Sequence, residues 1–269
     1  VVGALLVYTF VSMLKGGQTF DQVLGRVIYT LFFGTSGVLS TPVQVCAKFI
    51  AVFIIFGAFL ERTGISSFFI DLANAIAGWT SGGPAKVAVI SSALCGMVSG
   101  SSVGNTVTTG SVTIPMMKRT GYKPEFAGAV EAAASTGGQI MPPIMGAAAF
   151  LMAEYMNVTY GQVTLWAILP AVLYFGGIFI SVHLEAKKLG LRGIPRSELP
   201  RFKYLMRNVY LLLPLVFLIW VVTANIRSLQ YAASIAILIS IAVSLVGTIR
   251  DAAAKAKETK TGSAAGIAV

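Results

Sequence analysis

The sequence predicts an all-α, polytopic membrane protein, and three observations carry that prediction. Of the 269 residues, 56% are hydrophobic and only 11% are charged. The mean hydropathy of +0.81 is typical of chains whose helices are surrounded by lipid. Two polar, glycine-containing stretches, Ser99–Thr109 and Ser135–Pro143, interrupt the apolar sequence. Because irregular backbone at membrane depth is tolerated only where it lines a protein cavity, these stretches indicate a solute or ion site.

Residues 1–81 are predicted to form the spans and interfacial helices of a scaffold. Val1–Leu14 is a short apolar run, and Phe20–Phe33 mixes aromatic and charged side chains as an interfacial helix would. Pro42–Leu60 is long and apolar enough for a span, and it ends at a charged pair. Ser66–Trp79 is amphipathic and modestly apolar, which favours a helix lying along the membrane surface.

Residues 160–250 are predicted to hold three further spans: Tyr160–His183, Val209–Val222 and Leu229–Ile249. A membrane helix needs roughly 20 apolar residues, so the shortest of these runs must extend into its flanks. Residues 251–269 form a basic tail that ends in an apolar stretch typical of the start of another helix. The chain begins within an apolar run and without Met, so we expect it to be part of a longer protein.

Residues 82–159 are predicted to form the transport region, which opens with a helical hairpin. Basic residues mark both ends of Gly82–Met117, with Lys86 at one end and Lys118 at the other. Two full membrane crossings need roughly 40 residues plus a turn, which is more than this stretch provides. The spacing therefore predicts a re-entrant hairpin that turns at Ser99–Asn105 within the membrane.

A broken helix is predicted to follow the hairpin. As one continuous helix, Tyr122–Met156 would be about 52 Å long, whereas the hydrocarbon core of a bilayer is roughly 30 Å thick. Pro142 and Pro143 remove two N–H donors and leave upstream carbonyls unpaired. We therefore expect a break at Ser135–Pro143 that divides this stretch into two half-helices.

The distribution of basic residues predicts the topology. With the hairpin opening toward the cytoplasm, most of the 20 Lys and Arg residues gather on the cytoplasmic side, and only Lys15, Arg26 and Arg227 lie outside. This is the positive-inside pattern of membrane proteins. The net charge of +10 is thus a topology signal, and nucleic acid is not an expected partner. The predicted cytoplasmic loops are Lys118–Lys123 and Lys187–Arg207, and the predicted periplasmic loops are Asn157–Gly161 and Thr223–Ser228.

The oxygen-rich turn of the hairpin is suited to sodium. Neutral hydroxyl and carbonyl oxygens can replace the water around this ion without a buried charge. A hairpin tip also presents a helix C-terminus, which favours a cation, beside a helix N-terminus, which favours an anion. One turn can therefore hold a cation and a carboxylate. The polar side chains there are those of Ser99, Ser101, Ser102, Asn105 and Thr106.

Each polar stretch also has a purely structural interpretation. Gly96, Gly100 and Gly104 have the spacing of a small-residue seam that packs one helix against another. The prolines alone could produce a simple kink. The seam explains the glycines but not the hydroxyls and the amide beside them, and two breaks so close together favour a site.

Glu131 and Glu154 are acids within the predicted broken helix. An acid inside a span is a candidate functional group, so Glu131 could carry a proton or shape a cavity. It could equally pair with basic residues nearer the surface or form hydrogen bonds within the scaffold, and this structural role is the favoured interpretation. Cys46 and Cys95 lie in apolar surroundings typical of small buried side chains.

The sequence also argues against an enzyme. We find no Ser–His–Asp set, nucleotide-binding motif or zinc signature in it. Glu131 and Glu154 belong to opposite halves of the broken helix and make no plausible catalytic pair. We therefore expect no enzymatic activity and no cofactor other than a coupling ion.

Several stretches between about Gly34 and Leu205 resemble the large membrane subunit of TRAP transporters, the tripartite ATP-independent periplasmic transporters of bacteria and archaea. Two of these stretches, Ala-Ser-Thr-Gly-Gly-Gln at 134–139 and His183–Leu191, are most similar to the fused permeases that work with TAXI-type binding proteins. The resembling stretches are Gly57–Gly64, Gly83–Ala88, Ser99–Val103, Ile114–Arg119, Gly121–Pro143 and His183–Leu191.

The resemblance implies an elevator-type secondary transporter built from two inverted repeats, of which this chain holds only the first. Each repeat has a re-entrant hairpin and a broken helix, which together bind sodium. The substrate pocket is then at most half built in this chain. The implied sodium residues are Ser99 and Ser102 at the tip and Ser135, Thr136, Gly138 and Pro142 at the break. Asn105 is added from its chemistry.

The predicted function is import of small organic acids, or carboxylates, with sodium across the cytoplasmic (inner) membrane of a bacterium or archaeon. The expected partners are a periplasmic solute-binding protein, a small transmembrane subunit or fused domain, the carboxylate substrate and the lipid bilayer. Two alternatives stay open. One is a proton-coupled organic-anion transporter, and the other is a non-transporting scaffold or channel subunit.

Overall fold

We describe the protein from a computed structural model that covers residues 2–34, 37, 39–195, 197, 199–200, 202–224 and 227–265. Side chains are described in these ranges except for residues 2, 202–203 and 250–265. All regular secondary structure in this part of the chain is helical, which confirms the predicted all-α class. The chain consists of two compact units, Val1–Ile50 and Ala51–Val269, and each is described by itself. The sequence predicted a division by function, with boundaries after residues 81, 159 and 250. That division is separate from these compact units and stays a prediction.

In the first unit, the helices follow the apolar and aromatic runs of the sequence. The predicted interfacial stretch Phe20–Phe33 is helical throughout, because its α-helix continues into a π-helical turn. Cys46, at the end of this unit, is exposed rather than buried. The elements are α1 (Val2–Lys15), α2 (Phe20–Ile28), η1 (Tyr29–Phe33), α3 (Thr41–Val45) and η2 (Cys46–Ile50).

Four helical stretches among the described residues are long and apolar enough to cross a membrane, and each contains a predicted span. The chain is thus a multi-pass membrane protein by length and composition. The stretches are Thr41–Arg62, Tyr160–Lys188, Tyr204–Thr223 and Leu229–Ile249. The elements that form them in the second unit are α4 (Ala51–Arg62), α10 (Tyr160–Lys188), α11 (Phe202–Asn208), η5 (Val209–Leu212), α12 (Leu213–Thr223) and α13 (Leu229–Ala265).

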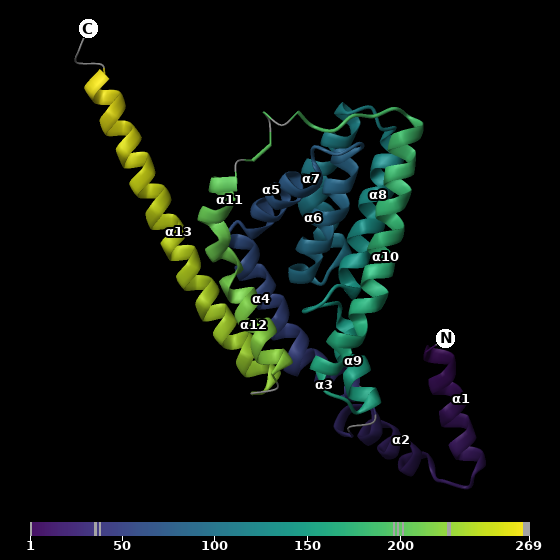
Figure 1. Cartoon of the computed structure of the whole chain (residues 1–269). Coiled ribbons are helices and arrows are strands. Elements are labelled where there is room, and N and C mark those ends of the chain that lie inside the picture. The colour runs from purple at the N-terminus through teal and green to yellow at the C-terminus, as the bar shows by residue number, and fades with distance from the viewer. Residues whose placement is uncertain are drawn as a thin grey trace. The chain divides into compact units, whose positions relative to one another are not determined.

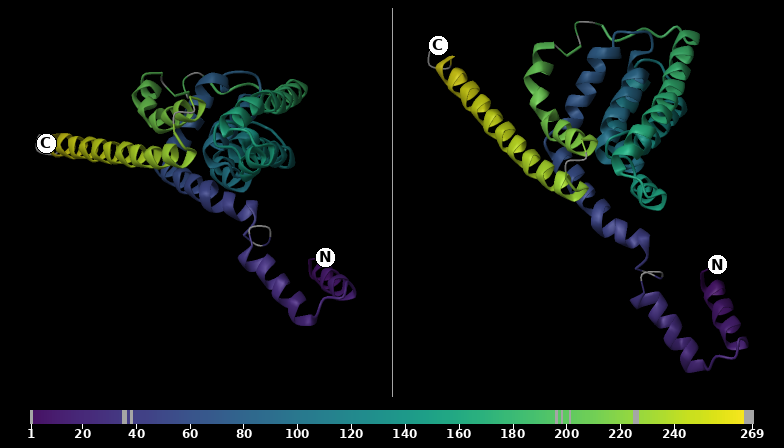
Figure 2. Two further views of the ribbon diagram at one scale, coloured as in Figure 1. Left: turned by 90° about the horizontal axis from the view of Figure 1, so that it is seen from below. Right: turned by 60° about the horizontal axis from the view of Figure 1, so that its bottom comes forward.

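The remaining helices of the second unit form a bundle around one buried helix. α6 lies among α5, α7 and α8, while α13 packs along α4 and α12 (Figures 1 and 2). Alanine residues of α6 and α8 fill much of the core between them, and small side chains let membrane helices approach closely. The elements are α5 (Ile65–Ala77), α6 (Gly83–Ser99), α7 (Ser102–Arg119), α8 (Pro124–Gly137), η3 (Gly138–Ile140) and α9 (Ala147–Met156).

The predicted hairpin is present as α6 and α7, and its turn is tighter than predicted. α6 ends at Gly100, whose φ of 58° places it in the left-handed region. α7 begins directly after Ser101, whose hydroxyl oxygen accepts the N–H of Gly104 at 3.2 Å and so caps the new helix. The turn therefore consists of Gly100 and Ser101, and Asn105 lies inside α7 rather than in the turn.

The predicted break in the following helix is also present, a few residues later than expected. α8 stays helical through Gly137, and η3 adds one short turn. The chain is irregular from Met141 to Gly146 before α9 begins, and the Pro142–Pro143 peptide bond is cis. Ser135 and Thr136 thus belong to the last turn of α8, where the sequence alone placed them in the break.

α5 forms a helix where Ser66–Trp79 was predicted to be helical, and its apolar face packs on α6. Its predicted place along the membrane surface stays a prediction. The buried side chains on this face are Ile65, Phe68, Phe69, Ala73 and Ala77.

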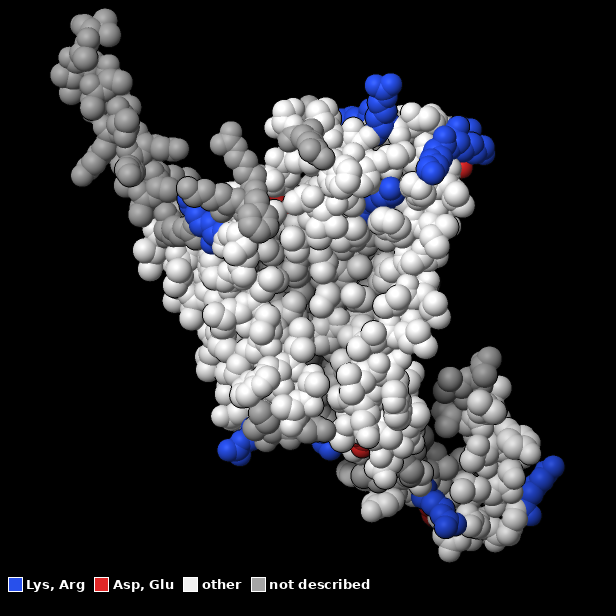
Figure 3. Space-filling model, in the orientation of Figure 1, with Lys and Arg blue, Asp and Glu red and all other residues white. Residues whose placement is uncertain are grey.

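The loops of the second unit meet at two opposite ends. At one end the hydroxyl of Ser81 donates to the carbonyl of Leu191 at 3.0 Å, and the amide of Ile194 donates to the carbonyl of Gly78 at 2.8 Å. At the other end Gly161 packs on the carbonyl of Val222. Basic side chains gather near the upper ends of α7, α8 and α10, and the side chains below them on this face are mostly uncharged (Figure 3).

Lys86 lies buried at the upper end of the hairpin, where the sequence predicted a boundary. Its ammonium group donates to the hydroxyl of Thr80 at 3.1 Å and lies 5.4 Å from the ring centroid of Phe179. Lys86 is only 4% exposed, so its ammonium group has little contact with water. The hydroxyl and the aromatic face stabilise the charge instead.

Candidate ion site at the hairpin tip and helix break

The tip of the hairpin and the break in the next helix are in direct backbone contact. A Cβ atom at Gly96 would lie 2.3 Å from the Cα atom of Gly138, and one at Gly100 would lie 2.2 Å from the carbonyl oxygen of Met145. Only glycine permits such an approach. The predicted packing role of the glycine seam therefore holds for Gly96 and Gly100. It does not hold for Gly104, which meets only the side chain of Ser101.

Ser102 is tied to the break by a hydrogen bond. Its hydroxyl oxygen accepts from the side-chain amide of Gln139 at 3.1 Å, and the carbonyl of Gln139 accepts the N–H of Gly146 at 2.7 Å. Ser99 lies half-buried beside it, with its hydroxyl 3.4 Å from the carbonyl of Ser101. Gln139 was not among the predicted site residues, although its amide directly follows the glycines of the break.

Asn105 is the most buried polar group of the tip. It is 1% exposed, and its Nδ2 atom donates to the carbonyl of Ser92 at 2.8 Å. This bond fixes the orientation of the amide, because a carbonyl can only accept. Its Oδ1 atom is buried and has no hydrogen-bond partner among the described residues. A buried oxygen in this state is a candidate ligand for a cation.

Glu131 lies 0% exposed within a cage of four hydroxyl groups. Neither oxygen of its carboxylate pairs with a Lys or Arg of the described part of the chain. The sequence left three roles open for Glu131: pairing with surface bases, hydrogen bonding in the scaffold, and proton transfer. The structure supports hydrogen bonding in the scaffold. Its partners are Ser92 at 2.8 Å, Thr109 at 2.5 Å, Thr113 at 2.5 Å and Ser135 at 2.9 Å.

The predicted residues of the break therefore separate into distinct environments. Ser135 faces inward and belongs to the cage of Glu131, while Thr136 is exposed and its hydroxyl donates to the carbonyl of Ala132 in its own helix at 2.7 Å. Gly138 is buried against the hairpin, and Pro142 is half-buried in the irregular segment. The structure thus brings Ser102, Asn105 and Gly138 to the contact between tip and break and leaves the Thr136 side chain outside it.

A residue far along the chain completes the break. The hydroxyl of Tyr160 donates to the carbonyl of Pro143 at 3.0 Å and also contacts the carbonyl of Ile144. These are carbonyls that the irregular segment leaves without helical partners. No local sequence signal identifies this role, because Tyr160 belongs to the first turn of the next span.

The polar side chains at the contact between tip and break, those of Ser99, Ser102, Asn105 and Gln139, are all neutral. Within the described part of the chain, no group of three or more His, Cys, Asp or Glu residues is placed to hold a metal ion. The tip instead combines the C-terminal end of α6, whose last carbonyls favour a cation, with the N-terminal end of α7. Opposite helix ends beside a broken helix also occur at the binding sites of secondary transporters.

The fold and this site define a class: an all-helical, multi-pass membrane protein in which a helical hairpin packs against a broken helix. The chain belongs to the DctM component family of tripartite ATP-independent periplasmic transporters, whose profile matches residues 1–267. This is a family of transporter permeases and not of enzymes.

Among its relatives is the C4-dicarboxylate TRAP transporter large permease protein DctM of Vibrio cholerae, 28% identical over 186 residues that make up 68% of this chain and 38% of the relative. The protein of the same description from Pseudomonas aeruginosa is 30% identical over 150 residues, 56% of this chain and 35% of the relative. The sialic acid TRAP transporter large permease protein SiaM of Vibrio cholerae is 25% identical over 168 residues, 62% of this chain and 39% of the relative. The chain therefore spans less than two fifths of the length of these relatives.

Proposed function

We propose that this chain is part of a permease that imports small organic acids with sodium across the cytoplasmic membrane. The observation that carries the proposal is the contact between the hairpin tip and the broken helix, which places opposite helix ends and neutral oxygens together. Membership of the DctM family supports the transport role. A periplasmic solute-binding protein would deliver the substrate, and a small transmembrane subunit or a fused domain would accompany the permease.

Sodium is the proposed coupling ion because the available ligands at the tip are neutral. Ser99 and Ser102 would contribute hydroxyl oxygens, and Asn105 its unpartnered amide oxygen. Ser135 and Gly138 would contribute through the end of α8, and Pro142 through the carbonyls that its missing N–H group releases. Because the hydroxyl of Thr136 is bonded to its own helix, we propose that this residue takes part through its main chain.

The carboxylate of the substrate would meet the N-terminal end of α7. The free N–H groups of a helix start favour an anion, and Ser101 and Ser102 add hydroxyls there. The named substrates of relatives, C4-dicarboxylates and sialic acid, both carry carboxylates. We further propose that the hairpin is re-entrant and that the chain forms the first of two inverted repeats of an elevator-type transporter of the fused, TAXI-associated kind.

Glu131 supports one alternative, a proton-coupled transporter. A carboxylate buried at this depth without a basic partner is costly to keep charged, and it lies in the helix that carries the break. Its four hydroxyl partners satisfy both oxygens in place, which favours the structural role. A second alternative is a non-transporting scaffold or channel subunit. A scaffold would give no uptake of its own, and a channel would give uptake that does not respond to a sodium gradient.

Uptake against sodium concentration, at fixed pH, tests the proposal in the complete transporter with its binding protein in proteoliposomes. Ser102→Ala removes one neutral ligand and the bond to Gln139, which should cost about 1–3 kcal/mol of binding free energy. We therefore expect the apparent sodium affinity to fall roughly tenfold or more. Ser181→Ala is the matched control, because that hydroxyl is exposed and bonds only the Gly177 carbonyl of its own helix.

Unchanged sodium dependence in a well-expressed Ser102→Ala variant would exclude this hydroxyl from the site. Suppose instead that uptake by the unaltered protein is independent of sodium, follows a pH gradient and is abolished by Glu131→Gln. The coupling ion would then be the proton and not sodium.

A further inference from the structure

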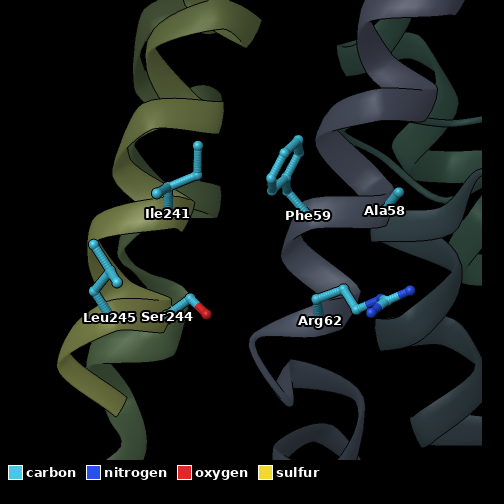
Figure 4. A pocket seen from close by; sticks show the side chains of 6 residues that line it. All are labelled: Ala58, Phe59, Arg62, Ile241, Ser244 and Leu245. Carbon is cyan, nitrogen blue, oxygen red and sulfur yellow. The ribbon is translucent and has the colours of Figure 1, made fainter. Parts of the chain in front are cut away.

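A pocket of about 440 Å³ lies between α4 and α13, which carry parts of two candidate membrane spans. Volumes of ~300–1,000 Å³ are typical of small-molecule sites. The lining is apolar except for one arginine and one serine. The lining residues are Ala58, Phe59 and Arg62 of α4 and Ile241, Ser244 and Leu245 of α13 (Figure 4).

The pocket lies near the C-terminal ends of both spans. Arg62 is the last residue of the span Thr41–Arg62, and Leu245 stands about one turn before the end of the span Leu229–Ile249. The other apolar residues of the lining, such as Phe59, stand about one turn further from these ends. A positive charge therefore lies at the end of the pocket nearer the membrane surface, and apolar side chains line the part nearer the hydrocarbon core.

The apolar part of the pocket is open to the surroundings of the two helices. Phe59 is 43% exposed and Leu245 is 59% exposed, although both belong to spans. The neighbouring side chains on α13, Val246 and Ile249, are 56% and 68% exposed. Exposed apolar side chains on a membrane span contact acyl chains, which are as apolar as they are. An acyl chain can therefore enter the pocket from the bilayer.

Arg62 supplies a charge that is not neutralised by an acid in the described part of the chain, where it makes no ion pair. The preceding Glu61 serves another contact, because its carboxylate accepts the hydroxyl of Thr108 in α7 at 2.7 Å. The planar guanidinium group of an arginine binds two oxygens of a phosphate at once. Ser244 adds a hydroxyl group from the opposite wall (Figure 4). These two side chains are suited to a phosphate group.

We infer that this pocket binds one anionic phospholipid of the cytoplasmic leaflet, with the phosphate at Arg62 and an acyl chain beside Phe59 and Ile241. A phospholipid has one charged and one apolar part, in the same order as the lining of the pocket. A small soluble phosphate would leave the apolar part of the lining without a partner.

The net charge of the lipid follows from its place in the membrane. The end that holds Arg62 is predicted to be cytoplasmic, because a basic tail follows α13, and this leaflet carries the anionic lipids. An anionic headgroup compensates the charge of Arg62, whereas a zwitterionic headgroup brings a positive charge of its own. The inference goes beyond the proposed function, since it uses none of the residues proposed to bind sodium or the organic acid.

Native mass spectrometry of the complete permease in detergent, stripped of its own lipids, tests the inference by counting bound phospholipid. We expect phosphatidylglycerol to bind about tenfold more tightly than phosphatidylcholine with the same acyl chains. Arg62→Gln should remove this preference by weakening the binding of phosphatidylglycerol to the level of phosphatidylcholine. Arg192→Gln is the matched control, because it removes an equal charge at an exposed position of the loop after α10, outside the pocket.

Ala58→Phe tests the apolar part of the pocket. Ala58 is exposed, so a larger side chain there fills the pocket without displacing the core. This variant should bind both lipids more weakly and keep the ratio between them. Thermal unfolding gives a second readout, because a ligand of the folded state stabilises it by mass action. Phosphatidylglycerol should raise the midpoint of the unaltered protein and of Arg192→Gln more than that of Arg62→Gln.

Three results would each overturn the inference. The first is equal affinity of the unaltered protein for the two lipids. The second is unchanged binding of phosphatidylglycerol in both Arg62→Gln and Ala58→Phe, which would mean that another part of the complete permease fills the pocket. The third is displacement of the lipid by an equal concentration of glycerol 3-phosphate, which would make the ligand a soluble phosphate. Neither sodium nor uptake enters these measurements, so their outcome is independent of the proposed function.

Discussion

At the scale of single residues, burial decides which polar groups belong to the site. Adjacent residues such as Ser135 and Thr136 read alike in the sequence, yet one bonds the buried Glu131 and the other its own helix. Successive helix positions are about 100° apart, so one of two neighbours normally turns outward. Sequence reasoning identified the oxygen-rich stretches but had no means to orient them, because their orientation depends on contacts with distant residues, such as the bond from Thr108 to Glu61, 47 positions away.

The cage of Glu131 provides a prediction at this scale. Glu131→Gln replaces a carboxylate oxygen that accepts hydroxyl hydrogen bonds by an NH₂ group that can only donate. Some of the four hydroxyl donors then lose their acceptor, which should lower stability by about 1–3 kcal/mol. The check is a lower thermal unfolding midpoint in detergent. Glu154→Gln, at an exposed position of α9, should unfold like the unaltered protein. Equal midpoints for all three proteins would contradict a structural role for the cage.

At the scale of elements, most of the fold could be predicted because it depends on local signals. Apolar runs mark the spans, and glycine and proline mark the two interruptions. The exact turn of the hairpin could not be predicted. α7 begins directly after its cap Ser101, so Asn105 lies inside the helix and not in the turn. The partner of α5 and the role of Tyr160 were also beyond the sequence, because both depend on packing between distant segments.

The glycine contact between hairpin and break yields a prediction at the element scale. Gly96→Ala places a methyl group 2.3 Å from the Cα atom of Gly138, so the two backbones must separate. Backbone cannot move aside as a flexible side chain can, and overpacking typically costs about 1–3 kcal/mol. We expect a lower unfolding midpoint together with weaker sodium binding.

Gly104→Ala is the control for this change. The nearest atoms to the added methyl group would be those of the Ser101 side chain at 3.5 and 3.6 Å, which is ordinary contact. This variant should keep its sodium binding and fold at least as well as the original, because alanine is the better helix former. A Gly96→Ala protein that behaves like Gly104→Ala would show that the hairpin tip and the break are not held together by this contact.

At the scale of the whole molecule, the second unit has two ends of different charge. The loops around Ser81, Leu191 and Tyr122 meet at one end, where Tyr122 donates to the carbonyl of Gly82 at 3.4 Å. Basic residues occupy the last turns of α7 and α10 at this end. The two loops predicted to be periplasmic meet at the other end, where Gly161 contacts Val222. Residues 225 and 226 of the second loop lie outside the described residues, as do residues 196, 198 and 201 of the predicted cytoplasmic loop.

Grouping the loops in this way makes the predicted orientation testable with few probes, because all loops of one end must respond together. We predict that Asn157→Cys is labelled from outside intact cells by a membrane-impermeant maleimide and that Lys188→Cys is labelled only after the cells are opened. The physical reason is the excess of Lys and Arg at the end that carries Lys188, since such loops stay on the cytoplasmic side.

Cys46, which is exposed, must first be replaced, while the buried Cys95 should react little and can serve as an internal control. Labelling of Lys188→Cys but not of Asn157→Cys in intact cells would invert the orientation. The proposed delivery of substrate from the periplasm to this arrangement of tip and break would then have to be abandoned.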